Sequence, residues 1–221
     1  MDVNSHYNNF IQDRTIAKAG FWFALFAFIA ISAFGIVQAL QILGIFSYPL
    51  DEILIYGFSL CIVVPFMLAM LALYHITKPG KKFWSHASVL FTVIYVVFVT
   101  ANYVVQLATV IPSTVKGVAN GINILQQTPH SLFWDFDAIG YIAMGLATLF
   151  AVPVFERQGF QKWVRYSFLL HSLVTPLIVV VYFYPTFSEK LLLIATPWVV
   201  TAPLSMLMLS LMFKKIVDAK K

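Results

Sequence analysis

The strongest constraint in this sequence is a series of six apolar blocks, each long enough to cross a lipid bilayer as a helix. A membrane span needs about 20 mainly apolar residues. The blocks lie near 19–43, 53–76, 86–111, 133–155, 163–184 and 191–213. Only 10% of the 221 residues are charged, compared with about 25% in soluble domains. The sequence therefore predicts an all-α, polytopic integral membrane six-helix bundle.

The basic residues predict the orientation of this bundle. Twelve of the 14 Lys and Arg residues fall on one side of the six predicted spans, and only Lys116 and Lys190 fall on the other. Basic connections between spans stay on the cytoplasmic side. We therefore expect both termini to be cytoplasmic, with 1–18 and 214–221 as polar tails. The expected location is the cell membrane, as a multi-pass protein of a bacterial inner membrane.

The segment 112–132 is the only long connection expected on the outer side. Its apolar residues recur at helical spacing, which favours a short interfacial helix or a lid. They are Val115, Val118, Ile122 and Leu125. Gly117 and Gly121 weaken such a helix, so a flexible loop is the alternative.

Several classes of function are excluded or disfavoured by what the sequence lacks. Its single cysteine, Cys61, excludes an internal disulfide or a cysteine metal cluster. No Lys/Arg-rich run with interleaved aromatic residues is present, so we expect no nucleic-acid partner. No HxxxH or HExxH pair indicates a metal site. No complete catalytic signature is present, and the sequence leaves any cofactor undefined.

Two carboxylates stand at the start of the fourth predicted span. Asp135 and Asp137 are two residues apart, so on a helix they point about 200° away from each other. Asp137 shares a face with Tyr141, four residues later. Acids at a membrane boundary are costly unless they stay in water, pair or serve a function. We therefore expect Asp137 to point inward and Asp135 to meet water or lipid headgroups.

Polar side chains in the other spans gather at the same depth, in the outer half. In the third span Tyr95, Asn102, Gln106 and Thr109 follow one helical stripe. The other candidate ligand-binding residues are Gln38, Gln41, Tyr182, Trp198 and Thr201. Together with Asp137 and Tyr141 they suggest an outward-facing pocket. The alternative is that these side chains are interhelical hydrogen-bond partners or an aromatic belt.

Prolines and one histidine add further hypotheses. Pro197 and Pro203 predict that the sixth span is bent or locally unwound, as in transporters that bind a solute at a broken helix. The alternative is a kink that serves packing alone. His171 lies within the fifth predicted span. It is either a buried hydrogen-bonded residue or a proton relay, because histidine titrates near neutral pH.

The second half of the chain resembles a group of uncharacterised six-span bacterial membrane proteins classed as domains of unknown function. The matching residues are Gly140, Tyr141, Gly145 and the turn Gln161-Lys162-Trp163. The resemblance implies an all-helical six-span fold and no activity. Substrate-binding subunits of vitamin uptake systems also have six spans with both termini inside. The first outer loop of this chain is short, which counts against that resemblance.

Three functions remain open from the sequence. The first is binding, and transport, of a small-molecule ligand through the outward-facing pocket. The second is an intramembrane enzyme that acts on a lipid or quinone, with Asp137 or His171 as acid or base. The third is a non-catalytic subunit of a membrane complex, or a homo-oligomer, that packs through the small-residue stripe of the first span. That stripe comprises Ala17, Gly20, Ala24 and Ala27.

Overall fold

Six helical spans make up the computed structural model, which describes residues 3–118 and 121–219. The spans are α1 (Val3–Ile42), α2 (Leu50–Ile76), α3 (Lys82–Val105), α5 (Leu132–Ala151), the pair α6 (Gln161–Ser172) and α7 (Thr175–Phe183), and α9 (Pro197–Ala219). Short elements join them: η1 (Pro79–Lys81), η2 (Gln106–Val110), α4 (Ile111–Val115), η3 (Asn123–Leu125), η4 (Val152–Val154), α8 (Glu189–Leu192) and η5 (Leu193–Ala195). The described residues contain no strand. The predicted all-α six-helix membrane fold is confirmed.

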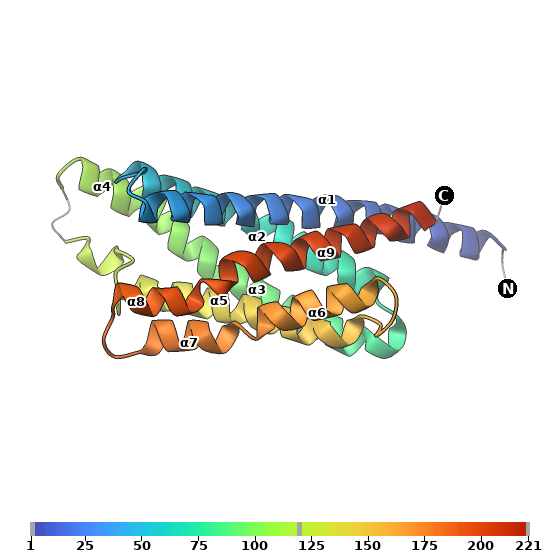
Figure 1. Cartoon of the computed structure of the whole chain (residues 1–221). Coiled ribbons are helices and arrows are strands. Elements are labelled where there is room, and N and C mark those ends of the chain that lie inside the picture. The colour runs from blue at the N-terminus through green and yellow to red at the C-terminus, as the bar shows by residue number, and fades with distance from the viewer. Residues whose placement is uncertain (1–2, 119–120, 220–221) are drawn as a thin grey trace.

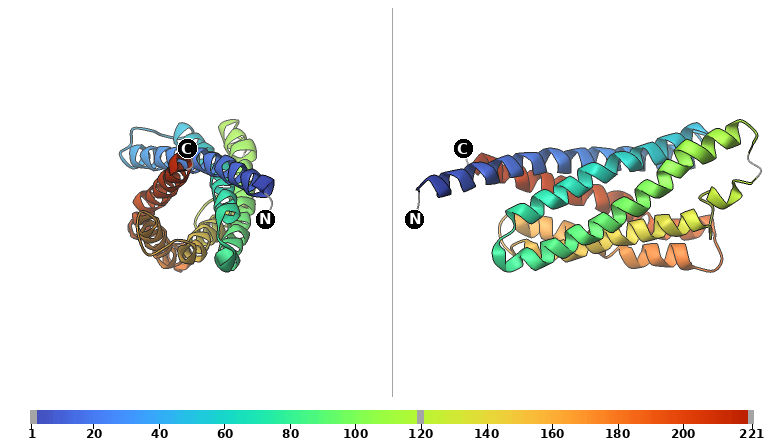
Figure 2. Two further views of the ribbon diagram at one scale, coloured as in Figure 1. Left: turned by 90° about the vertical axis from the view of Figure 1, so that its right-hand side faces the viewer. Right: turned by 180° about the vertical axis from the view of Figure 1, so that it is seen from behind.

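The spans are arranged as a closed ring in the order of the sequence (Figures 1 and 2). Each span packs against the next one, and α9 closes the ring by packing along α1. The start of α1 and the end of α9 lie at the same end of the bundle (Figure 1). We call this the basic end, because Lys78, Lys81, Lys82, Arg157 and Lys215 also lie there. The opposite end, where α5 begins, is called the Asp137 end.

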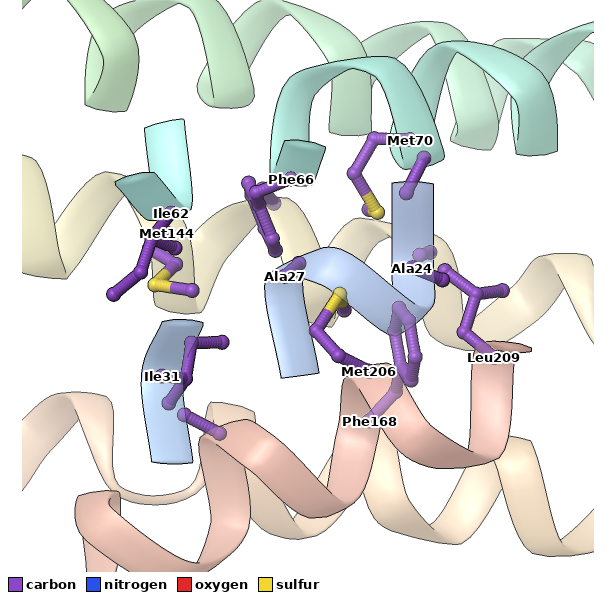
Figure 3. Packing of buried hydrophobic residues seen from close by; sticks show 14 of the residues in the cluster. Ala24, Ala27, Ile31, Ile62, Phe66, Met70, Met144, Phe168, Met206 and Leu209 are labelled. Atoms are coloured by element: carbon purple, nitrogen blue, oxygen red, sulfur yellow. The ribbon is translucent and has the colours of Figure 1, made fainter. Parts of the chain in front are cut away.

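The interior of the ring is filled by apolar side chains from facing spans. Figure 3 shows Phe66 of α2, Met144 of α5 and Met206 of α9 among the buried residues of this core. The small-residue stripe of α1 is part of it, since Ala17, Ala24 and Ala27 are fully buried. A Cβ on Gly20 would lie 2.6 Å from the Phe213 ring of α9. The stripe is therefore used for packing within the chain, where small residues allow close helix contact.

Irregular turns occur in the third, fifth and sixth spans, and those in the fifth and sixth lie just before a proline. The fifth span breaks at Leu173 and Val174, between α6 and α7. The third continues from α3 into a π-helical turn, η2. In the sixth, α9 begins at Pro197 and runs through Pro203 without interruption. The predicted irregularity of the sixth span lies before Pro197, where α8 and the 3₁₀ turn η5 replace a continuous helix.

The long connection after α4 does not form the continuous short helix that its apolar spacing suggested. α4 ends at Val115, and Gly117 then adopts a left-handed conformation (φ +70°) that helical residues do not adopt. Gly121 also has a positive φ (+95°), and the chain forms only the 3₁₀ turn η3 before α5. Part of the expected helix, 119–120, lies outside the described residues.

Candidate functional site

The candidate site is centred on Asp137, in the second turn of α5. Ser131 caps this helix by accepting a hydrogen bond from the backbone N–H of Trp134 (3.2 Å). The Asp137 side chain is only 3% exposed, whereas Asp135 is exposed. The two acids therefore lie on opposite faces of the helix, as their spacing predicted.

Three side chains donate hydrogen bonds to the Asp137 carboxylate. On Oδ1, the Tyr103 hydroxyl donates at 2.6 Å and the Asn102 amide at 3.3 Å. On Oδ2, the Tyr182 hydroxyl of α7 is the donor. The Tyr141 hydroxyl lies 3.1 Å from the Tyr103 hydroxyl and extends this network. Side chains from α3, α5 and α7 thus converge on one carboxylate.

A glycine on α5 allows α3 to come this close. A Cβ on Gly140 would lie only 2.5 Å from Cγ2 of Val99 on α3. Gly140 is one turn after Asp137, and Val99 is one turn before Tyr103. The close approach of these two helices brings Asn102 and Tyr103 within hydrogen-bond reach of the carboxylate.

The connection before α5 covers the site from the Asp137 end. Asn102 donates to the Gln127 side-chain carbonyl (2.9 Å) as well as to Asp137. Gln106 donates to the Leu125 carbonyl (2.7 Å) and accepts from the Gln127 backbone N–H (3.2 Å). Gln106 stands at the first position of the π-helical turn and is buried. These bonds hold 125–127 over the carboxylate, which is therefore covered at this end.

Aromatic rings surround the network on several sides. The Tyr56 ring stacks on Tyr103, with centroids 5.3 Å apart. Trp134 packs against Tyr182 at 4.6 Å. Trp198 of α9 packs edge-on against Tyr141 at 5.1 Å. The carboxylate therefore lies within a shell of rings, whose negative faces attract cations.

A second polar cluster lies deeper in the bundle. His171 is 1% exposed, and its Nδ1 lies 3.2 Å from the Thr201 hydroxyl of α9. The ring of Trp198 lies 6.3 Å from the His171 ring, so Trp198 connects this cluster to Tyr141. Three buried polar atoms here have no partner among the described residues: His171 Nε2, Trp198 Nε1 and Thr175 Oγ1.

The other residues proposed from the sequence lie outside the Asp137 network. Tyr95 is buried and packs edge-on against Phe66, and no described hydrogen bond joins it to Asp137. Gln41 donates to Asp51 (2.7 Å) in a separate pair between α1 and α2. Gln38 is half-buried, and the described chain gives it no hydrogen-bond partner.

The sequence analysis missed two contributors to the network and one buried acid. Tyr103 lies next to Asn102, about 100° around the helix, and so falls outside the single stripe that was considered. Gln127 belongs to a connection without regular structure, where periodicity carries no signal. The buried acid is Asp51 at the start of α2, which is 7% exposed. Of these residues, only Tyr103 could have been found from the sequence, because it is a polar residue directly beside the stripe.

Comparison of the chain with known protein families, with curated proteins and with solved structures found no match. Within residues 3–118 and 121–219, no three His, Cys, Asp or Glu side chains come together to hold a metal ion.

Proposed function

We propose that this integral membrane protein binds a small organic cation at Asp137 and passes it across the membrane, with the basic end in the cytoplasm. The observation that carries the proposal is a buried carboxylate within a membrane span that has no ion-pair partner among the described residues. Burying a charge is costly unless it is paired. A cationic ligand would supply the missing charge.

Hydrogen bonding leaves one acceptor position on the carboxylate for such a ligand. A carboxylate offers about four lone-pair positions, and the three hydrogen bonds described above use three of them. One more donor, such as a ligand ammonium, can be accommodated. The rings of Tyr103, Tyr141 and Trp198 would then contact the rest of the cation, with about 0.5–2 kcal/mol of attraction for a suitably placed ring.

Access would require the cover to open. The bonds from Gln106 to 125–127 are few and local, so this segment can act as a lid that releases the Asp137 end to the outside. Passage would continue toward His171, where unpaired polar atoms lie at the α6–α7 break. Each unpaired buried group costs about 1–3 kcal/mol, so water or a passing solute would stabilise this region.

The test is a titration of purified protein with small amines and quaternary ammonium ions, followed by tryptophan fluorescence. Trp134 and Trp198 both contact tyrosines of the network. Asp137→Asn keeps the shape and removes the charge. We expect a ten- to hundredfold loss of affinity, because one charged hydrogen bond is worth about 1.5–3 kcal/mol.

Asp135→Asn is the matched control, because it removes an exposed acid from the same turn of α5. It should leave binding unchanged. Equal effects of the two substitutions, or no effect of Asp137→Asn, would mean that the acids only mark the membrane boundary.

A second candidate function is an intramembrane enzyme that acts on a lipid or quinone. The observation that favours it is the hydroxyl chain from Tyr141 through Tyr103 to Asp137, because such a chain can pass a proton to a substrate oxygen. Tyr103→Phe distinguishes the two functions. It breaks the proton path but keeps the aromatic ring, so turnover would be lost while cation binding would persist.

A further inference from the structure

A cavity of about 1180 Å³ lies at the basic end, well away from Asp137. It is formed by the connection from η4 to α6, the start of α6 and the last turns of α9. Four basic side chains line it, and they are Lys81, Arg157, Arg165 and Lys215. Glu156 is the one acidic residue in the lining, which leaves a formal charge of +3 (four minus one).

Most of this positive charge is not neutralised by the protein. The Glu156 carboxylate is shared between Lys78 (3.1 Å) and Lys81 (3.3 Å). Arg157, Arg165 and Lys215 have no ion-pair partner in the part of the chain that the structure describes. Like charges brought together at one site favour an anion from outside the chain.

One of these cations is held firmly in place. Arg165 is half-buried, and its Nη1 donates to the backbone carbonyls of Val152 (3.0 Å) and Phe155 (3.5 Å). No described residue accepts a hydrogen bond from its Nε or Nη2. The guanidinium fork can therefore donate to a phosphate without having to be reoriented.

The cavity also has apolar walls that continue into the bundle. Phe155, Phe160, Met212 and Ile216 line it beside the basic residues. A smaller cavity of about 210 Å³ adjoins it, and both are lined by Phe155, Glu156, Gln161, Met212 and Ile216. The smaller cavity reaches Leu73 and Ile76 of α2. A ligand that fits both cavities needs an anionic head and an apolar tail.

Neighbouring aromatic residues place the cavity at the membrane surface. Trp163 and Tyr166, on either side of Arg165, are 60% and 49% exposed. Exposed Trp and Tyr side chains collect at the level of lipid headgroups. The Lys162 ammonium lies 5.9 Å and 5.7 Å from these two rings. The basic residues of the cavity are thus at the depth of a lipid phosphate.

We propose that this cavity binds the phosphate headgroup of an anionic phospholipid from the adjacent leaflet. Arg165, Arg157 and Lys215 contact the phosphate, and the first part of an acyl chain lies against the half-buried Phe160 and Ile216. Basic pockets between membrane helices are a known way to hold anionic headgroups. This site is separate from the Asp137 site and does not depend on its function. A soluble phosphate would use the basic residues but not the apolar walls, so the lipid fits both.

The experiment is native mass spectrometry of the full-length protein in detergent, with phosphatidylglycerol and phosphatidylcholine of identical acyl chains. We expect phosphatidylglycerol to be bound preferentially. The double substitution Arg157→Gln/Lys215→Gln removes two exposed basic residues from the lining. It should weaken phosphatidylglycerol binding by about 30-fold.

The matched control is Lys162→Gln/Lys214→Gln, which removes the same charge from two exposed neighbours outside the lining. It should leave binding unchanged. Equal losses in both double variants would show diffuse surface attraction and overturn the proposal. No loss in either, or glycerol 3-phosphate binding as tightly as the lipid, would also overturn it. Circular dichroism of each variant confirms that the helices remain folded.

Discussion

The two ends of the bundle differ in how their charged side chains are paired and covered. At the Asp137 end, one carboxylate receives three hydrogen bonds from neutral donors, and the chain closes over it. At the basic end, a large cavity is lined by four cations and one carboxylate, and of these four cations only Lys81 pairs with that carboxylate among the described residues. Donors and acceptors can satisfy one another and pack tightly, whereas charges of one sign cannot. The Asp137 end is therefore closed but lacks a counter-charge, whereas the basic end is open and carries an excess of cations.

The two ends are also far apart along the fourth span, which α5 and η4 form. Asp137 and Pro153, which lines the cavity, are separated by 16 residues, or about 24 Å at the α-helical rise. Substitutions at such a distance usually have additive effects on stability. Substitutions at the Asp137 end and at the basic end can therefore be measured independently of each other.

The largest effect is expected from Asp137→Leu, which removes the acceptor at the centre of the closed end. The Tyr103 and Tyr182 hydroxyls would lose a buried partner, and Asn102 would lose one of its two. Interhelical hydrogen bonds in membranes are worth about 0.6–1.7 kcal/mol each. We expect a loss of about 2–4 kcal/mol in the free energy of unfolding, measured by denaturation in detergent micelles.

Asp135→Leu is the control for this measurement. The side chain is exposed at the same end of α5, so its replacement should change stability by less than about 0.5 kcal/mol. A similar loss in both variants would show that helix capping or solubility, and not the polar network, accounts for the effect.

A smaller effect is expected from Gln106→Ala, which loosens the cover while leaving the carboxylate intact. The substitution removes the bonds to the Leu125 carbonyl and to the Gln127 N–H. At about 1 kcal/mol per bond, hydrogen exchange of the Gln127 amide should accelerate roughly tenfold or more. Gln38→Ala is the control, because this half-buried glutamine has no hydrogen-bond partner in the described chain. Unchanged exchange at Gln127 would show that other contacts hold the cover.

The spans were predictable from the sequence because membrane crossing requires only length and apolar composition. The inward direction of Asp137 was predictable because helical periodicity fixes relative faces. Asn102 and Tyr141 were placed near it by the same reasoning. Tyr182 lies on a different span, and only its depth suggested the contact.

The remaining features depend on contacts that periodicity does not encode. Gln127 meets Asn102 across 25 positions, through a connection with two left-handed glycines. The break at Leu173 and Val174 precedes Pro176 and would require knowledge of how α7 packs. The cavity at the basic end is lined by three segments that lie far apart in the sequence, so no local pattern predicts it.

The smallest effect is expected from Glu156→Gln, which removes the one carboxylate in the lining of the cavity at the basic end. Glu156 joins the α2–α3 connection, through Lys78 and Lys81, to the α5–α6 connection. Its side chain is 45% exposed, so the ion pairs contribute little. The hydrogen bonds from Lys78 and Lys81 lower the pKa of the Glu156 carboxyl from its ordinary value of 4.5.

The lowered pKa fixes the pH dependence of this small contribution. A carboxyl with a lower pKa in the folded state stabilises that state fully above pH 4.5, and the stabilisation disappears as the pH falls through the folded-state pKa. The wild-type protein should therefore melt slightly higher than the Glu156→Gln variant at pH 7, and the two curves should coincide in more acidic solution. High salt should reduce the difference at neutral pH, because exposed pairs are screened. A difference that grows on acidification would show that Glu156 acts through a contact other than its two lysines.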